Sequence, residues 1–152
     1  MRIFLFALSV VSLAACTRDN LVWTEIYNFR DNRWDGKEQV VFVPDTLSLS
    51  SGVATKGIIT FRYGVNADVE SFPLIMEMEC AETGEYRCDS IQVQLLPMSL
   101  RNGNNSKVGI FELNDTIGLR QPPGYGWRIA FRQPSLQEAI TGIFSLIFTL
   151  EK

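Results

Sequence analysis

Residues 72–80 read Phe-Pro-Leu-Ile-Met-Glu-Met-Glu-Cys, and from Met76 onward apolar and acidic side chains alternate along this stretch. Successive side chains of a strand point to opposite faces of a sheet, so alternation with a period of two predicts a strand with one buried face. The face predicted to be buried carries Leu74, Met76, Met78 and Cys80. The opposite face carries Glu77 and Glu79, which we expect to meet solvent.

The same alternation appears in residues 125–132, which read Tyr-Gly-Trp-Arg-Ile-Ala-Phe-Arg. Here the aromatic and aliphatic side chains of Tyr125, Trp127, Ile129 and Phe131 share one face, opposite Arg128 and Arg132. Further apolar segments of strand length occupy residues 22–29, 39–43, 57–65, 91–96, 108–111 and 143–150.

Residues typical of turns separate these segments, as in Gln-Pro-Pro-Gly at 121–124. A short helix is predicted only at 135–139, where Ser135 can cap the first turn and Glu138 follows three residues later. About eight short strands joined by turns predict an all-β fold, an antiparallel β-sandwich of immunoglobulin-like or jelly-roll-like type.

The N-terminal segment predicts export and lipidation. Arg2 is followed by an apolar run from residue 3 to residue 13 and then by Ala14, Ala15 and Cys16. This is a secretory signal peptide, too short to span a bilayer, and a cysteine after two small residues is the bacterial lipobox. The alternative is a plain signal peptide with a chance cysteine. We therefore expect a cleaved signal peptide at 1–15, a lipidated tether at 16–21 and one domain at 22–152.

Lipidation would place a diacylglyceryl thioether on the Cys16 sulfur and an acyl group such as palmitate on its new amine. Each buried acyl methylene contributes about 0.8 kcal/mol, and two or more chains hold a protein stably on a membrane. The residue after the cysteine is Thr17 rather than aspartate. We therefore expect the outer membrane, with its periplasmic face favoured over the cell surface, and we expect no cofactor other than this lipid.

Composition narrows the function further. The net charge is −3, and removal of the signal peptide takes away Arg2, which leaves −4 without any basic stripe. A nucleic acid partner is therefore not expected. The chain contains no histidine, which excludes a Ser-His-Asp triad and the usual zinc ligand. We expect a protein that is not an enzyme.

Cys80 and Cys88 form the remaining cysteine pair and flank a turn at Thr83, Gly84 and Glu85. In an oxidising compartment a hairpin would bring the two within reach of a disulfide; two free thiols are the alternative. Pairing these cysteines also sets methionines opposite polar residues. A β-bulge at 89–90 is therefore expected to reconcile the disulfide with the core.

Other groups of residues admit two interpretations. Residues 31–36 partly resemble a calcium loop, but Arg33 takes a ligand position and Phe42 stands where glutamate is needed, so we expect a turn with Trp34 packed on the sandwich. Glu77 and Glu79 are either a glycosidase carboxylate pair or a solvated strand face. Four aromatic residues either line a glycan site or fill the core, namely Trp23, Trp34, Tyr125 and Trp127.

An acidic, a hydroxyl and a branched apolar residue follow one another three times, at 45–47, 89–91 and 115–117. A strand that starts after a turn explains each occurrence adequately. The hydroxyl residues of these triplets are Thr46, Ser90 and Thr116.

The order and spacing of several motifs resemble the gliding-motility lipoprotein GldH family across nearly the whole mature chain. These motifs are Cys16, residues 27–29, Trp34 with 40–42, residues 58–62, Asp89, residues 124–127, Gln133, and Gly142 to Lys152. The sequence departs from the family at 70–73 and at 134–135. The resemblance implies a lipid-anchored outer-membrane component that supports gliding motility and the associated secretion system, with no established enzymatic activity and with other envelope proteins as partners.

In the bacteria that carry this family, the three triplets also resemble O-glycosylation acceptors, which makes Thr46, Ser90 and Thr116 candidate sites. A second hypothesis for the chain is a glycan-binding lipoprotein of the envelope, and a third is a hydrolase that uses Glu77 and Glu79. An exposed aromatic platform would favour glycan binding, whereas buried tryptophans would favour a non-catalytic component. The hydrolase requires both carboxylates in one concave site.

Overall fold

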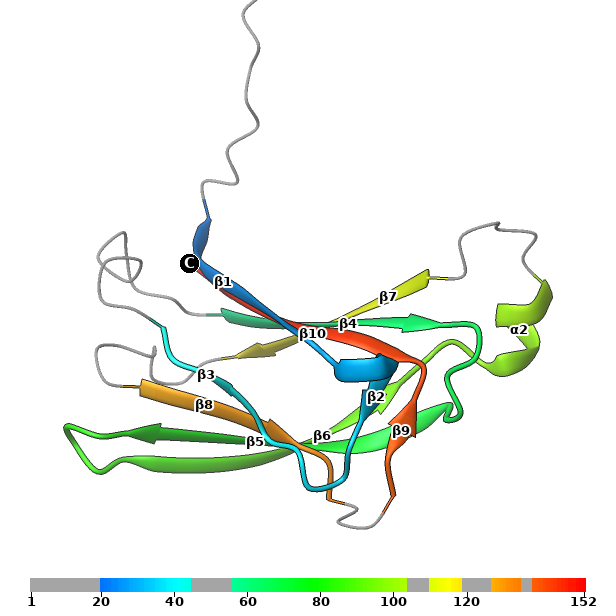
Figure 1. Cartoon of the computed structure of the whole chain (residues 1–152). Helices are drawn as coiled ribbons and strands as arrows, with labels where there is room; N and C mark the ends of the chain where they lie inside the picture. The colour runs from blue at the N-terminus through cyan, green and yellow to red at the C-terminus, as the bar shows by residue number, and fades with distance from the viewer. Residues whose placement is uncertain (1–19, 45–55, 104–109, 119–126, 135–137) are drawn as a thin grey trace, which may run out of the picture.

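The computed structural model describes residues 20–44, 56–103, 110–118, 127–134 and 138–152 (Figure 1). These residues form two four-stranded sheets and one two-stranded sheet, and all neighbouring strands pair antiparallel. The predicted all-β antiparallel sandwich is confirmed. Cys16 and Thr46 lie outside the described residues.

One large sheet has the strand order β1-β10-β4-β7 and the other β3-β8-β5-β6, while β2 pairs with β9. The first sheet consists of β1 (Leu21–Asn28), β10 (Ile143–Glu151), β4 (Lys56–Gly64) and β7 (Ile110–Gly118). The second consists of β3 (Val40–Phe42), β8 (Trp127–Arg132), β5 (Ser71–Cys80) and β6 (Tyr86–Gln94). The small sheet is β2 (Arg33–Trp34) with β9 (Ile140–Thr141), and the helical turns are η1 (Arg30–Asn32) and α2 (Met98–Gly103).

Aromatic side chains from both large sheets meet between the two layers. Phe148 of β10 lies with its ring centroid 5.2 Å from that of Phe131 in β8, and Phe61 of β4 lies 5.5 Å from Phe72 of β5. The predicted inward faces of β5 and β8 are buried, including Met76, Met78 and Cys80 on β5 and Trp127, Ile129 and Phe131 on β8. Burial of apolar area contributes about 25 cal/mol per Å², so the packing of these faces against the other large sheet stabilises the fold.

Trp34 is fully buried, as the turn interpretation of residues 31–36 predicts. Its ring stacks on Phe29 at 5.0 Å, and its Nε1 donates a hydrogen bond of 3.0 Å to the Glu38 carbonyl oxygen. The Glu38 carboxylate accepts a bond of 2.6 Å from the Tyr27 hydroxyl, and this bond is the main reason that the pKa of Tyr27 is raised. Trp34 and Glu38 therefore fix this turn against Tyr27 and Phe29 at the end of β1.

Several expected boundaries are wrong. β6 begins at Tyr86 rather than at residue 91, and β7 runs from Ile110 to Gly118 rather than over 108–111. Both are edge strands, so polar residues are tolerated along them and the apolar signal is weak. Glu138 and Ala139 are not helical, while 135–137 lie outside the described residues. A helix appears instead at Met98–Gly103, directly after Pro97.

The expected disulfide between Cys80 and Cys88 is also wrong, because the hairpin closes earlier than the cysteine spacing implies. The Cys80 N–H donates to the Glu85 carbonyl oxygen at 2.9 Å, and Gly84 adopts a φ of 70° that suits a tight turn. This register sets Cys88 opposite Glu77 without any bulge. Cys80 consequently faces the core, whereas Cys88 lies exposed on the outer face, and no disulfide joins them.

We therefore expect a maleimide to label Cys88 but not Cys80 in the native chain purified without reductant. Hydrogen bonds from Thr83 lower the pKa of the Cys80 thiol, but its burial limits access of the reagent. Mass spectrometry of the labelled peptides measures this difference, and labelling in denaturant is the control that should modify both cysteines. A peptide pair joined through Cys80 and Cys88 would contradict the free-thiol arrangement.

Candidate functional site

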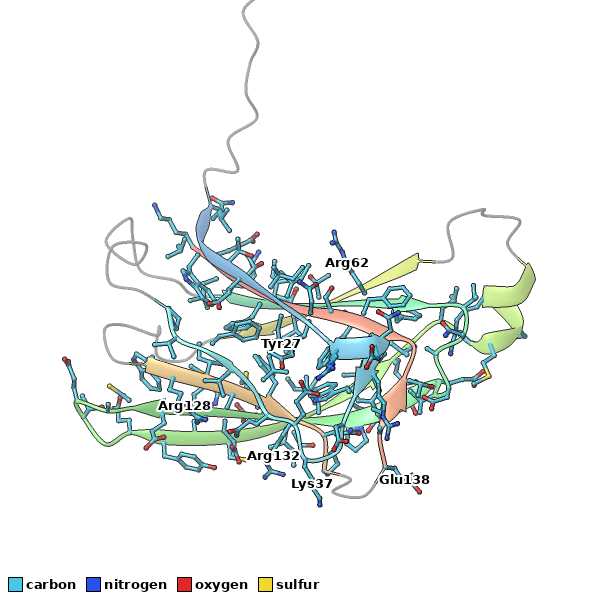
Figure 2. All side chains as sticks on the ribbon, viewed as in Figure 1. Tyr27, Lys37, Arg62, Arg128, Arg132 and Glu138 are labelled. Atoms are coloured by element: carbon cyan, nitrogen blue, oxygen red, sulfur yellow. The ribbon has the colours of Figure 1, made fainter. Side chains whose placement is uncertain are left out.

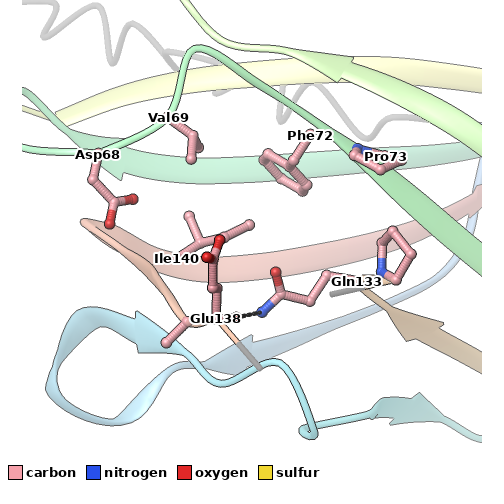
Figure 3. A pocket seen from close by; sticks show the side chains of 9 residues that line it. Asp68, Val69, Phe72, Pro73, Gln133, Glu138 and Ile140 are labelled. Atoms are coloured by element: carbon pink, nitrogen blue, oxygen red, sulfur yellow. Dashed lines mark hydrogen bonds between the residues drawn. The ribbon is translucent and has the colours of Figure 1, made fainter. Parts of the chain in front are cut away.

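A pocket of about 330 Å³ lies at one end of the sandwich (Figure 3). Its walls come from the connection between β4 and β5, the start of β5, the end of β8 and the segment that leads into β9. The apolar walls include Val69, Phe72, Pro73 and Ile140. The polar side chains on the lining are those of Asp68, Gln133 and Glu138.

Gln133 is the buried polar group of this pocket, with only 3% of its surface exposed. Its Nε2 donates to the carbonyl oxygens of Trp34, at 2.9 Å, and Glu138, at 3.1 Å. Both hydrogens of the amide nitrogen are therefore used, and these two acceptors fix the orientation of the amide. Oε1 lies on the opposite side, toward Phe72 in Figure 3, and no described residue donates a hydrogen bond to it.

Asp68 and Glu138 add two carboxylates to the rim. Asp68 Oδ1 accepts a hydrogen bond of 3.0 Å from the Thr141 N–H, while Oδ2 accepts none from the described residues. The Asp68 N–H in turn donates to the Thr141 carbonyl oxygen at 3.3 Å, which holds this part of the connection against β9. The Glu138 side chain is exposed. Every polar side chain on the lining thus offers acceptor atoms to the pocket.

Arg101 fixes the wall that carries Asp68 and Val69. Its side chain is only 1% exposed and reaches from α2 under the β4–β5 connection. The guanidinium donates to the carbonyl oxygens of Leu96 at 2.5 Å, Ala67 at 2.7 Å and Val69 at 2.7 Å. It also lies 5.7 Å from the ring centroid of Tyr63. One side chain therefore holds two backbone segments in place through three carbonyl oxygens.

Gly142 lies where the same connection passes closest to the start of β10. It adopts a φ of 78°, and its N–H donates to the Asn32 carbonyl oxygen at 2.8 Å. Its own carbonyl oxygen accepts a bond of 2.8 Å from the Gly64 N–H. A Cβ at this position would lie 2.5 Å from the backbone Cα of Ala67. Glycine is therefore required for the close approach of these segments.

Two of the three predicted hydroxyl sites lie among the described residues, and both are exposed. Ser90 lies on β6 and Thr116 on β7. Asp89, beside Ser90, pairs with Arg87, and adjacent strand residues point to opposite faces. Thus the acidic and hydroxyl groups of this triplet do not share a face. Ser90 and Thr116 lie on different strands, and neither lines the pocket. The fold therefore does not bring these predicted sites together.

Glu77 and Glu79 lie on the outer face of β5 and are not part of the pocket lining. Arg132, which is labelled in Figure 2, has its Nη2 3.2 Å from Glu77 Oε1, and Glu77 Oε2 accepts a bond of 3.1 Å from Gln39 Nε2. Arg128 donates to the same Gln39 at 2.9 Å. Glu77 therefore belongs to a charged surface network, and neither Glu77 nor Glu79 lies on the lining of this pocket.

The three tryptophans are buried: Trp34 is fully enclosed, Trp127 is 7% exposed and Trp23 is 8% exposed. Tyr125 lies outside the described residues. The described tryptophans therefore fill the core and offer no flat platform for a sugar ring. Among the residues that the structure describes, no cluster of three metal-ligating side chains is present, and no helix is long and apolar enough to cross a membrane.

Known proteins show no close similarity to this chain in sequence. No protein-family model matches the chain, and no curated protein matches it. Among solved structures, it is similar to one described as "Structure of Eiger TNF from S. frugiperda", at 9% identity and a TM-score of 0.39. That match covers 79% of this chain and 90% of the other. We draw nothing about this chain from so weak a likeness.

The sequence did not single out the pocket residues for a site. The sequence marks Gln133 only through the family resemblance. Asp68 lies in a polar turn, and Arg101 lies beside asparagine and glycine in a stretch whose composition predicts a loop. No local pattern marks them, because the chain segments that form the pocket are far apart in sequence. A strand-ending glutamine followed by proline is the single feature that could have drawn attention to Gln133.

Proposed function

We propose that this chain is a GldH-like lipoprotein, anchored in the outer membrane by lipid on Cys16, that supports gliding motility or the associated protein-secretion machinery. Its role is to hold another envelope component at the membrane rather than to catalyse a reaction. The lipobox Leu13-Ala14-Ala15-Cys16, the absence of histidine and the family-like spacing of motifs support this proposal. The periplasmic face of the outer membrane is its proposed location.

The lipobox is the observation that carries this proposal, and the position of the pocket relative to the tether is compatible with it. β1 begins at Leu21, five residues after Cys16, and an extended chain of that length spans at most about 18 Å. Leu21 pairs with Glu151, and Glu151 pairs with Lys56 at the start of β4. The pocket lies beyond the other end of β4, roughly 27 Å away along the strand. An anchor at Cys16 would thus present the pocket away from the bilayer.

A glycan-binding role receives less support. It would need exposed aromatic side chains, and Trp34 and Trp127 are both buried. Within the proposed function, glycans are covalent modifications, and the exposed hydroxyls of Ser90 and Thr116 are the proposed acceptors. Thr46 remains a third candidate acceptor from its sequence triplet alone.

Substitution Cys16→Ala is the direct test of the anchor. The variant is expected to lose incorporation of an alkyne-labelled fatty acid and to move from the detergent phase to the aqueous phase, because the acyl chains provide the membrane affinity. The matched control is Cys88→Ala, which removes an exposed thiol and should leave both readouts unchanged. Unchanged fatty-acid labelling of Cys16→Ala would contradict the anchor.

The same membranes test the partner. Crosslinking of the anchored wild-type chain, followed by affinity purification, is expected to recover motility or secretion proteins of the envelope. The Cys16→Ala variant should lose these crosslinks, since it no longer resides beside them. Recovery of glycan alone from the wild-type chain would contradict a role as a machine component.

A further inference from the structure

We propose that the pocket at Gln133 binds a primary ammonium group carried on an aliphatic stem, as in a lysine side chain. This proposal gives the holding role proposed above a chemical specificity. The biological role of this binding rests on the proposed function, but binding itself does not, because the lipid on Cys16 is not part of the pocket.

The polar groups of the pocket select the charge of the ligand. The side chains of Asp68 and Glu138 are carboxylates, and the buried amide of Gln133 presents only its oxygen. Among the described residues of the lining there is no lysine or arginine. A ligand that enters must therefore supply hydrogen-bond donors and positive charge, which a protonated amine does with three N–H groups. An anionic ligand would meet repulsion without any compensating side-chain donor.

Gln133 distinguishes this pocket from a pair of carboxylates on the surface, because it adds a buried polar group in a fixed orientation. Its amide is held in one orientation by two backbone carbonyl oxygens, and the side chain is almost fully buried. Oε1 is not sealed from solvent, so either water or a ligand in the pocket can satisfy this acceptor. A bound ammonium group would satisfy Oε1 and would be attracted by the carboxylates of Asp68 and Glu138.

The apolar walls select a stem rather than a bare cation. Phe72, Pro73 and Ile140 would contact methylene groups, and the volume of about 330 Å³ is at the small end of ligand pockets. A hard divalent cation is a poor fit, because it requires six or more oxygen ligands and one Asp68 oxygen is already bonded to the Thr141 N–H. An alkylammonium group uses both the polar and the apolar walls.

The test uses the full lipidated chain in detergent and two probes, Nα-acetyl-lysine N-methylamide and 1,5-diaminopentane. NMR titration is expected to shift the Gln133 side-chain amide and the Ile140 methyl signals, with a dissociation constant in the millimolar range. Tighter binding of the blocked lysine would indicate a polypeptide source for the group, and tighter binding of the diamine would indicate a free amine. Both results require the same ammonium recognition.

The matched variant is Asp68→Asn with Glu138→Gln, which removes both charges and keeps side-chain size. Its affinity is expected to fall about tenfold or more, because the paired charges are lost. The control Glu79→Gln removes an exposed carboxylate outside the pocket and should bind as the wild type does. Thermal melting of each variant verifies that the fold is intact.

The lysine probe with its side-chain amine acetylated should not bind, since it lacks the charge. Equal binding of the acetylated and the free probe, or undiminished binding by the double variant, would overturn the proposal. So would the absence of any shift at Gln133 and Ile140 at saturating probe concentrations. These outcomes leave the fatty-acid labelling of Cys16 unaffected, so failure of the pocket proposal and failure of the anchor can be told apart.

Discussion

Substitution Arg101→Ala is expected to lower the free energy of unfolding by about 3–5 kcal/mol, a large share of the stability of a small domain. The guanidinium supplies the donors to the carbonyl oxygens of Leu96, Ala67 and Val69. Its removal leaves these oxygens without donors and opens a void under the β4–β5 connection. Urea unfolding followed by tryptophan fluorescence measures the loss.

Arg30→Ala is the matched control for this experiment. Its side chain is 95% exposed and makes only a long contact of 3.8 Å with Asp31, so the change should stay within about 0.5 kcal/mol. Arg101→Lys should fall between the two, because a single ammonium group cannot reach three separate carbonyl oxygens in the fixed fork of a guanidinium. Equal stability of Arg101→Ala and Arg30→Ala would contradict a structural role for Arg101.

Substitution Gly142→Ala is the second change with a large expected effect, again about 3–5 kcal/mol of destabilisation. The new Cβ would lie 2.5 Å from both the Cα and the N of Ala67. These are backbone atoms, so the clash cannot be relieved by rotation of a side chain. The positive φ of Gly142 adds the cost of a left-handed conformation for a residue with a Cβ.

Gly84→Ala separates these two contributions. Gly84 has a similar φ of 70°, but a Cβ there would have no atom within 4 Å. This variant should therefore lose only the conformational part, about 1–2 kcal/mol. The difference between the two variants, measured by thermal melting and urea unfolding, reports the contact with Ala67. Similar losses at both glycines would show that the close approach is not rigid.

Both substitutions act on the same segment as the proposed binding site. Arg101 and Gly142 each contact the Ala67 backbone, and the next residue is Asp68. The guanidinium of Arg101 and the close approach of Gly142 hold this pocket wall in one position. A wall that is already ordered loses less conformational entropy when a ligand binds. We therefore expect the milder Arg101→Lys variant to weaken binding of the lysine probe even where the chain stays folded.

The sequence alone predicted the fold class and most strand positions, because a period of two assigns each residue of a strand to a face. Residues 72–80 and 125–132 are the clearest cases, since their described apolar sets are buried, whereas Glu77, Arg128 and Arg132 are half-buried and Glu79 is exposed. The edge strands were predicted less well. β6 places Arg87 and Asp89 across from Met78 and Met76 on the same face of the sheet, so its apolar signal disappears at one end.

Tertiary structure alone decided the hairpin register and the pocket. The face of Cys80 followed from its alternation with Glu79, but its cross-strand partner depended on where the chain turned, and Gly84 closed that turn three residues earlier than a Cys80–Cys88 pairing requires. Likewise, Gln133 acquired its role through Trp34, which lies 99 residues away. Periodicity reports the environment of each residue along its own strand, whereas register and pocket depend on contacts between distant segments that no local pattern encodes.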